Sequence, residues 1–291
     1  SLMISNSSAA TGFQAILDTM IGPDSVKVWI SDGLMAVFFL LVGLEIKREL
    51  LKGELSNFKN ASLPIFAAIG GMIVPAVIFT IFNHGTEYSN GWAIPMATDI
   101  AFSLAIVSML GKSVPSAIKV FLAALAIVDD LGAIVVIAIF YTDEIHWNYL
   151  AYSGLVIVLL AALNYFKVKK HIFYLIPGVF LWYFMHHSGI HATIAGVILA
   201  FTIPANSENE TEPSPLEKLE HFLHLPVSYA IMPIFALANT NITFKGGMVD
   251  GLFSNFGYGI VLGLILGKLI GINLFLSLIH ISEPTRLLSI S

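Results

Sequence analysis

The sequence predicts an all-α polytopic membrane protein, on three observations. Of its 291 residues, 57% are hydrophobic and 11% are charged, whereas a soluble domain carries about 25% charged residues. The mean hydropathy is +0.85. The apolar residues form blocks of roughly 14 to 25 separated by short polar segments, as in proteins that cross a membrane several times. The absence of cysteine excludes disulfides and thiol chemistry, and a net charge of -5 leaves no basic surface for nucleic acid.

Nine apolar blocks are predicted to span the membrane. In chain order they are 30–44, 61–82, 92–110, 117–141, 149–166, 172–186, 190–203, 225–240 and 256–279. The sixth and seventh blocks are short for a hydrocarbon core of about 30 Å. Residues before 30 are predicted to form an amphipathic or loop-like lead-in. We expect one transmembrane domain over 1–279 with an internal cytoplasmic loop at 204–222, followed by a tail at 280–291.

The distribution of basic residues predicts the orientation of these spans. If the 45–60 loop is cytoplasmic, ten of the 14 lysines and arginines fall on the cytoplasmic side, and only Lys27 and Lys245 fall on the other. Such a bias sets the topology of a membrane protein. The ten are Lys47, Arg48, Lys52, Lys59, Lys112, Lys119, Lys167, Lys169, Lys170 and Lys218.

Four charged residues lie inside predicted spans: Asp99, Asp129, Asp130 and Lys268. A charge at the middle of a bilayer costs about 2.5–3.5 kcal/mol on insertion scales. Such groups are expected to face a cavity, to pair with one another and to mark an ion or proton path. A structural ion pair would explain one carboxylate with one lysine, but three carboxylates exceed what a single lysine neutralises.

Asp99 follows a predicted break in its span. Pro95 removes a backbone donor and clashes with the preceding turn. Thr98 and Asp99 can hydrogen-bond to local backbone instead of continuing a helix. Broken spans free carbonyl groups and helix ends that can bind ions. A proline kink without function is the alternative.

The tandem acids Asp129 and Asp130 point about 100° apart if they lie on a helix. They therefore serve different roles, one as a cation ligand and the other as a counter-charge. Lys268 needs a carboxylate partner, for which both acids are candidates. It lies on a span whose glycines, spaced by four, predict a flat stripe that another helix approaches closely. These glycines are Gly259, Gly263, Gly267 and Gly271.

Charged groups also gather at the predicted cytoplasmic ends of two spans. Glu45, Arg48 and Glu49 close the first span, which a solvated helix end also explains. Glu220, His221 and His224 precede the 225–240 span. Histidine changes charge near neutral pH, so this group is interpreted either as a pH sensor or as a surface pair. His186, His187 and His191 are not predicted to bind a metal, because no acid completes the set.

Five motifs together resemble the NhaA-type Na+/H+ antiporter family, with the resemblance running from about residue 30 to about residue 277. They are Phe38–Glu45, Ala68–Pro75, Ala97–Phe102, Val128–Ala133 and Gly189–Thr193. The resemblance implies a fold with broken helices and inverted repeats. It implies a secondary transporter, not an enzyme, that exchanges Na+ or Li+ for H+ across the bacterial cytoplasmic membrane without a cofactor. The expected partners are these ions, protons, the lipid bilayer and a second copy in a homodimer, but no nucleic acid.

The resemblance also implies residue roles. Asp130 would be the principal carboxylate for Na+ and H+, and Asp129 would assist it, contact Na+ and pair with Lys268. Thr98 and Asp99 would compensate helix ends near the ion site. The residues matching the family's pH-response cluster are Glu45, Arg48, Glu49, Glu220, His221 and His224.

Two departures from the family pattern predict a chain truncated at both ends. The family's first span is mostly absent, and two spans that follow the lysine-bearing one are replaced by a tail from Leu278 that does not resemble the family. The alternatives are a passive cation channel, an intramembrane aspartyl protease, or a fragment of the antiporter that does not transport.

Overall fold

A computed structural model describes residues 2–98, 100–110, 114–142, 144–206, 212–240, 242–244, 246 and 249–282. The chain forms two compact units. The first unit comprises Ser1–Arg48 and Phe140–Lys245, and the second comprises Glu49–Ile139 and Gly246–Ser291. The single domain predicted for 1–279 stays a prediction.

The regular structure described in the first unit is helical apart from one short hairpin. Strands β1 (Met20–Ile21) and β2 (Asp24–Ser25) pair antiparallel, with Met20 opposite Ser25. Gly22 in the turn takes a φ of 69°, a conformation that favours glycine. The helices are α1 (Leu2–Ser5), α2 (Ala10–Leu17), α3 (Val26–Val28), the π-helical η1 (Trp29–Leu34), α4 (Met35–Lys52, whose last four residues belong to the second unit), α8 (Trp147–Tyr165), α9 (Ile172–Ser188), α10 (Ile194–Thr202), α11 (Pro215–Pro226), the π-helical η5 (Val227–Ile231) and α12 (Met232–Asn239).

Capping residues determine where α11 begins and where α9 ends. The Ser214 side chain accepts a hydrogen bond from the Glu217 backbone N–H, and the Glu217 carboxylate accepts one from the Ser214 backbone N–H. This capping box, with Pro215 at the first helical position, fixes where the helix starts. Helix α9 ends at Ser188 because Gly189 takes the left-handed conformation, with a φ of 87°.

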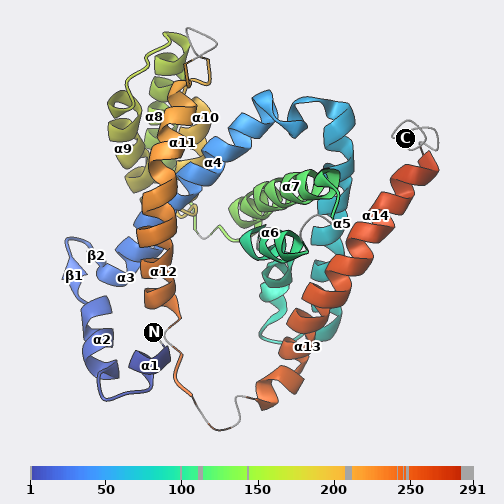
Figure 1. Cartoon of the computed structure of the whole chain (residues 1–291). Coiled ribbons are helices and arrows are strands. Elements are labelled where there is room, and N and C mark those ends of the chain that lie inside the picture. The colour runs from blue at the N-terminus through green and yellow to red at the C-terminus, as the bar shows by residue number, and fades with distance from the viewer. Residues whose placement is uncertain are drawn as a thin grey trace. The chain divides into compact units, whose positions relative to one another are not determined.

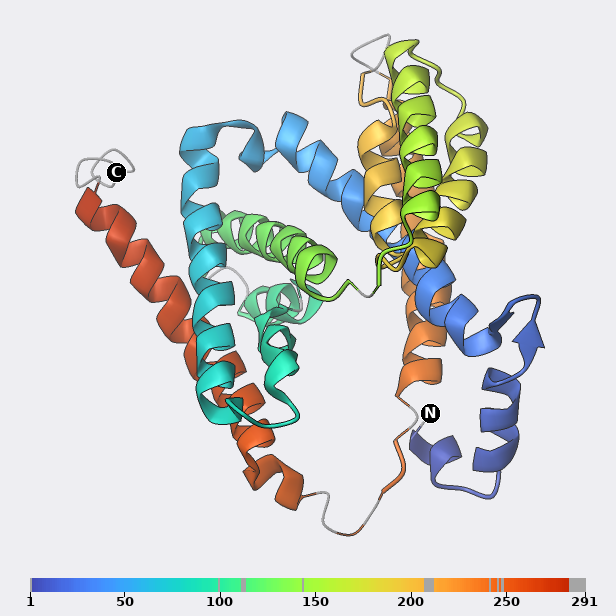
Figure 2. The same cartoon turned by 180° about the vertical axis from the view of Figure 1, so that it is seen from behind.

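The core of the first unit lies where α4 meets α9, α10 and α11. A Cβ added to Gly196 would collide with the Ala36 carbonyl oxygen on α4, and one added to Gly43 would lie 2.7 Å from the Ala200 Cβ on α10. Figure 2 shows α8 and α9 side by side in this unit. Its most deeply buried side chains include Leu44, Leu160, Tyr174, Leu181, Ile203 and Leu216.

The second unit is built on two long helical segments that lie side by side, α5 and α14 (Figure 1). Helix α13 continues through a π-helical turn into α14, so that Asn255–Leu278 forms one apolar span. The elements are the 3-10 helix η2 (Glu54–Ser56), α5 (Phe58–Asn83), the 3-10 helix η3 (Ser89–Met96), α6 (Ile100–Met109), α7 (Ser116–Phe140), the 3-10 helix η6 (Asp250–Phe253), α13 (Asn255–Leu262), the π-helical η7 (Gly263–Gly267) and α14 (Lys268–Ser282).

The predicted glycine stripe is confirmed as the surface on which α5 packs. A Cβ on Gly271 would collide with the Gly70 carbonyl oxygen of α5, and one on Gly267 would lie 2.8 Å from the Pro75 Cα. These positions therefore allow the two backbones to approach. The contact matters for function because Lys268 follows Gly267 directly, so the same packing positions the lysine.

Six helical segments among the described residues are long and apolar enough to cross a membrane. They are Val26–Lys52, Ala61–Asn83, Ala117–Phe140, Trp147–Tyr165, Pro215–Asn239 and Asn255–Leu278. Each contains or nearly coincides with a predicted span, except that Pro215–Asn239 starts ten residues earlier than expected. Two of the other predicted spans, 172–186 and 190–203, correspond to the shorter helices α9 and α10, of 17 and 9 residues. The third, 92–110, is interrupted.

Candidate ion site in the second unit

The interruption predicted at Pro95 is confirmed. Helix η3 ends at Met96, and Ala97 is extended, with φ of −62° and ψ of 147°. Helix α6 begins at Ile100. The break therefore leaves Ala97 and Thr98 outside regular helix, and it frees the carbonyl groups at the end of η3.

Three of the predicted site residues converge at this break. The Lys268 ammonium donates to Asp129 Oδ2 at 2.8 Å, and the Thr98 hydroxyl donates to the same oxygen. Lys268 also donates to the Met96 carbonyl at the C-terminal end of η3, where the helix dipole favours a cation. Asp129 is thus the carboxylate that pairs with Lys268, of the two candidates in the sequence.

The ion pair between Asp129 and Lys268 is buried. The Asp129 side chain is 3% exposed and that of Lys268 is 15% exposed. Asp129 Oδ1 is also buried and accepts no hydrogen bond from the described residues. A buried carboxylate oxygen without a donor is costly in free energy, so it offers a binding position to a cation, a proton or a water molecule.

A cavity of about 500 Å³ opens beside Asp129. Thr98, Ser103, Asp129 and Lys268 supply the polar side chains of its described lining. The wall is otherwise apolar and comes from α5, α7 and the α13–α14 segment, with Ala97 at the break. The remaining lining residues are Ala68, Gly71, Ala97, Leu122, Leu125, Leu264 and Ile272.

The other two acids predicted for the site are placed differently. Asp130 is partly buried on α7, about 100° around the helix from Asp129, and the described lining of the cavity does not include it. Asp99 lies outside the described residues. The roles of Asp99 and Asp130 therefore stay predictions.

Two contributors to the site were not predicted. The Met96 carbonyl was missed because backbone groups carry no sequence signal. Ser103 lines the cavity, and its spacing of four from Asp99 would have put it on the same helical face as that acid. In the part of the chain that the structure describes, no three Asp, Glu, His or Cys side chains form a metal-binding group. The site instead mixes a carboxylate, two hydroxyls and an ammonium.

The predicted pH-response residues lie elsewhere. In the first unit, the Arg48 guanidinium of α4 donates to the Glu220 carboxylate of α11. Glu220 is 9% exposed, while His221 and His224 are exposed on the same helix. Glu45 lies on α4 in this unit, and Glu49 lies on the same helix where the second unit begins.

Comparison with known proteins gives a family for this chain. A family model described as Na+/H+ antiporter 1 matches residues 1–288. The Na(+)/H(+) antiporter NhaA 2 of Flavobacterium johnsoniae is 56% identical over 281 residues, which cover 94% of this chain and 68% of that relative. The NhaA antiporter of Flavobacterium psychrophilum is 51% identical, over 97% of this chain and 73% of the relative.

A third relative is similar to the same degree. The NhaA antiporter of Dechloromonas aromatica is 51% identical over 275 residues, covering 94% of this chain and 71% of the relative. These matches agree with the family that the sequence motifs resemble. The chain therefore belongs to the Na+/H+ antiporter 1 family.

Proposed function

We propose that this protein is a secondary active transporter, not an enzyme, that exchanges Na+ for H+ across the bacterial cytoplasmic membrane. Its family and six membrane-length apolar helices support this function. The observation that carries it is the convergence of Thr98, Asp129 and Lys268 on a cavity beside a broken helix. A buried carboxylate beside a cavity is the arrangement that an intramembrane cation path requires.

Exchange follows from competition for a carboxylate. Na+ is a hard cation that binds oxygen ligands, and a carboxylate that holds a proton coordinates Na+ poorly. Binding of one ion therefore releases the other. We assign the principal carboxylate to Asp130 and an assisting role, with contact to Na+, to Asp129.

Lys268 adds a third charge to this competition. Its hydrogen bond to Asp129 Oδ2 must weaken when a cation approaches that oxygen. Na+ and H+ then compete for the group of charges rather than for one residue. Thr98 holds Asp129, and we assign Asp99 to compensating the helix ends at the break.

The proposed function also includes a transport cycle, a second cation and an assembly. Alternating access would rock one helical group against the other around the site. Li+ would be carried like Na+, because it is also a small hard cation. The protein would work without a cofactor and as a homodimer in the bilayer.

We also propose that exchange responds to pH. We assign pH response to Glu45, Arg48, Glu49, Glu220, His221 and His224. The contact between Arg48 and Glu220 supports this assignment, because it links α4 to α11 through charge. A change in the charge of these groups with pH would change how firmly α4 and α11 are held together.

The test is Na+-driven proton movement in vesicles that contain the full-length protein. Asp130→Asn should abolish the movement, because an amide cannot exchange a proton for Na+. Asp130→Glu, which keeps the carboxylate, should retain measurable exchange. Full exchange by Asp130→Asn would contradict the assignment.

The same vesicles distinguish the proposal from a passive cation channel. An exchanger moves protons against Na+ when only a Na+ gradient is imposed, and its rate saturates with Na+ concentration. A channel would carry Na+ without obligatory proton movement. Na+ flux that is indifferent to the pH gradient would therefore exclude exchange.

A further inference from the structure

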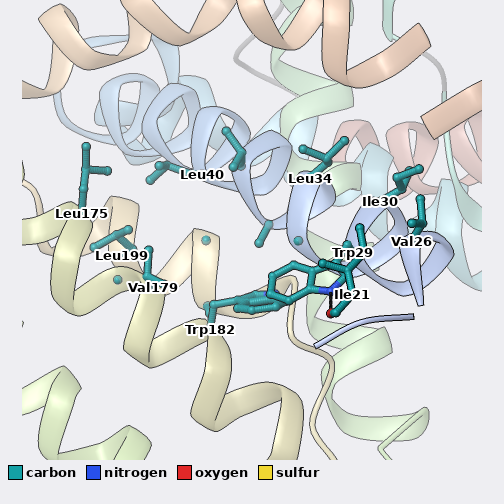
Figure 3. Close-up of a pocket in the computed structure, with 16 residues that line it drawn as sticks. Ile21, Val26, Trp29, Ile30, Leu34, Leu40, Leu175, Val179, Trp182 and Leu199 are labelled. Carbon is teal, nitrogen blue, oxygen red and sulfur yellow. Dashed lines mark hydrogen bonds between the residues drawn. The ribbon is translucent and has the colours of Figure 1, made fainter. Parts of the chain in front are cut away.

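An apolar groove of about 510 Å³ lies in the first unit, and none of its described lining residues is charged. It runs between α9 and the continuous helix of α3, η1 and α4, with α10 at its side (Figure 3). Leu40, Leu175 and Leu199 line one end, and Trp29 and Trp182 line the other. The volume is that of a small-molecule site, which spans about 300–1,000 Å³.

One polar side-chain atom of the lining has no hydrogen-bond partner among the described residues. The Trp29 indole N–H donates to the Ile21 carbonyl at 2.9 Å. The Trp182 indole N–H is buried and makes no hydrogen bond with the described residues. An unsatisfied buried donor is unfavourable, so an occupant with an acceptor oxygen beside Trp182 would be stabilised once the indole turns its N–H toward the groove.

The groove is continuous with an exposed apolar surface of α9. Val179 lines it and is 63% exposed, and its neighbours on α9, Ile176 and Phe180, are exposed as well. In a membrane-spanning chain, exposed apolar side chains of this kind contact acyl chains. The occupant that reaches the groove from this surface is therefore a lipid tail.

The tryptophan end of the groove is also its polar end. The Trp29 and Trp182 rings lie 5.3 Å apart, and Trp182 stacks on His186 at 5.7 Å. His186 Nδ1 lies 3.1 Å from an Asp32 oxygen, and His186 Nε2 lies 3.6 Å from an Asp24 oxygen. The sequence alone had suggested no acid beside His186. Tryptophans next to charged groups mark the membrane interface.

We propose that this groove binds one acyl chain of a phosphatidylethanolamine molecule. The tail lies along α4 toward Leu40, and an ester carbonyl accepts the hydrogen bond that the Trp182 N–H offers. The two carboxylates, Asp24 and Asp32, outnumber the single imidazole, which favours a head group with an ammonium. Lys27, the nearby basic residue on α3, is exposed and contacts neither acid among the described residues.

The test is photo-crosslinking in vesicles of phosphatidylethanolamine and phosphatidylglycerol that contain the full-length protein. A diazirine at the end of the acyl chain should label the residues around Leu40, Leu175 and Leu199. A diazirine next to the ester should label the tryptophan end. Label spread evenly over the exposed apolar faces of all spans would overturn the proposal.

A matched pair of variants tests the groove itself. A Cβ on Gly33 meets only ordinary contacts, 3.6 Å from Trp29 and 3.7 Å from Trp182, so Gly33→Leu should fold and fill the groove. Gly154→Leu adds the same bulk to α8, where nothing lies within 4 Å. We expect labelling to fall about tenfold in Gly33→Leu, equivalent to about 1.4 kcal/mol of binding, and to stay at the wild-type level in Gly154→Leu. Equal labelling of both variants would refute the groove as the site.

Trp182→Phe supplies an independent variant if Gly33→Leu does not fold. It keeps an aromatic ring and removes the N–H donor together with the pyrrole part of the indole, so labelling from the ester position should fall while labelling from the chain end persists. The other occupants are also resolved. Protein–protein crosslinks through the groove would show a second copy there, and an unlabelled groove in the full-length protein would show that a chain segment covers it.

An excess of phosphatidylglycerol that displaces the probe as well as phosphatidylethanolamine does would refute the head-group assignment.

Discussion

Two of the ion pairs that connect described helices lie in very different surroundings. Asp129 and Lys268 of the second unit have side chains that are 3% and 15% exposed. Glu220 and Arg48 of the first unit have side chains that are 12% and 40% exposed. The first pair also contacts a hydroxyl and a backbone carbonyl at a helix break. The second pair joins α4 to α11.

The difference teaches what each pair can do. A buried pair depends on both partners, because removing one leaves a charge without compensation. That dependence lets a cation entering the cavity change the state of the whole group. A partly exposed pair is screened by solvent and contributes little free energy, so it can open and close with modest changes in charge. We expect the first to carry transport and the second to adjust it.

The largest effect should follow from breaking the buried pair. Lys268→Met leaves Asp129 charged and unpaired, and the free energy of unfolding should fall by about 3–5 kcal/mol. Unfolding of the purified protein in detergent measures this change. The double variant Lys268→Met with Asp129→Asn should regain most of the loss, since neither charge of the pair remains. A double variant no more stable than the single one would mean that the pairing is not what stabilises the site.

Removing the hydroxyl at the break should have the next largest effect. Thr98→Val keeps the shape of the side chain but loses the donor to Asp129. Hydrogen bonds to charged groups contribute about 1.5–3 kcal/mol, and the unfolding free energy should fall within that range. Thr98→Ser keeps the donor and should unfold like the wild type. Equal losses in both variants would assign the effect to packing of the methyl group.

Ser103 sharpens the comparison inside the cavity. Ser103→Ala removes a hydroxyl from the lining, and the KM for Na+ should rise by the equivalent of about 0.5–1.5 kcal/mol, the contribution of a typical hydrogen bond. Transport kinetics in vesicles measure it, with the maximal rate unchanged. Ser103→Thr should keep the wild-type KM. An unchanged KM in the alanine variant would show that Ser103 does not contact the ion path.

The smallest effect on stability should come from the exposed pair. Arg48→Ala should lower the unfolding free energy by about 0.2–1 kcal/mol, as for other solvent-screened pairs. The pH profile of exchange should nevertheless move, while the maximal rate is retained. A destabilisation as large as that of Lys268→Met would remove the distinction between the two pairs. An unmoved pH profile would remove Arg48 from the pH-response group.

Much of the fold could be predicted because hydropathy is a local property. Runs of apolar residues predicted the six long helices, and Pro95 predicted the break that follows Met96. Helix ends were less predictable. Pro215–Asn239 begins ten residues before the expected span, because the capping box at Ser214 starts an amphipathic helix there. The polar face of that helix lowers its hydropathy, so an apolar run does not reveal its first turns.

By itself, the sequence determined which residues carry charge into the membrane and that a glycine stripe would bring two helices together. Only the tertiary structure decided that Asp129, and not Asp130, pairs with Lys268, and that Met96 and Ser103 belong to the site. It also brought Asp24 and Asp32 to His186 beside an apolar groove. The physical reason is the distance along the chain over which each effect acts. Hydropathy and turn chemistry act within a few residues, whereas these contacts join segments that are far apart in the sequence and meet only when helices pack together. At Gly267 and Gly271 a single Cβ would prevent that packing.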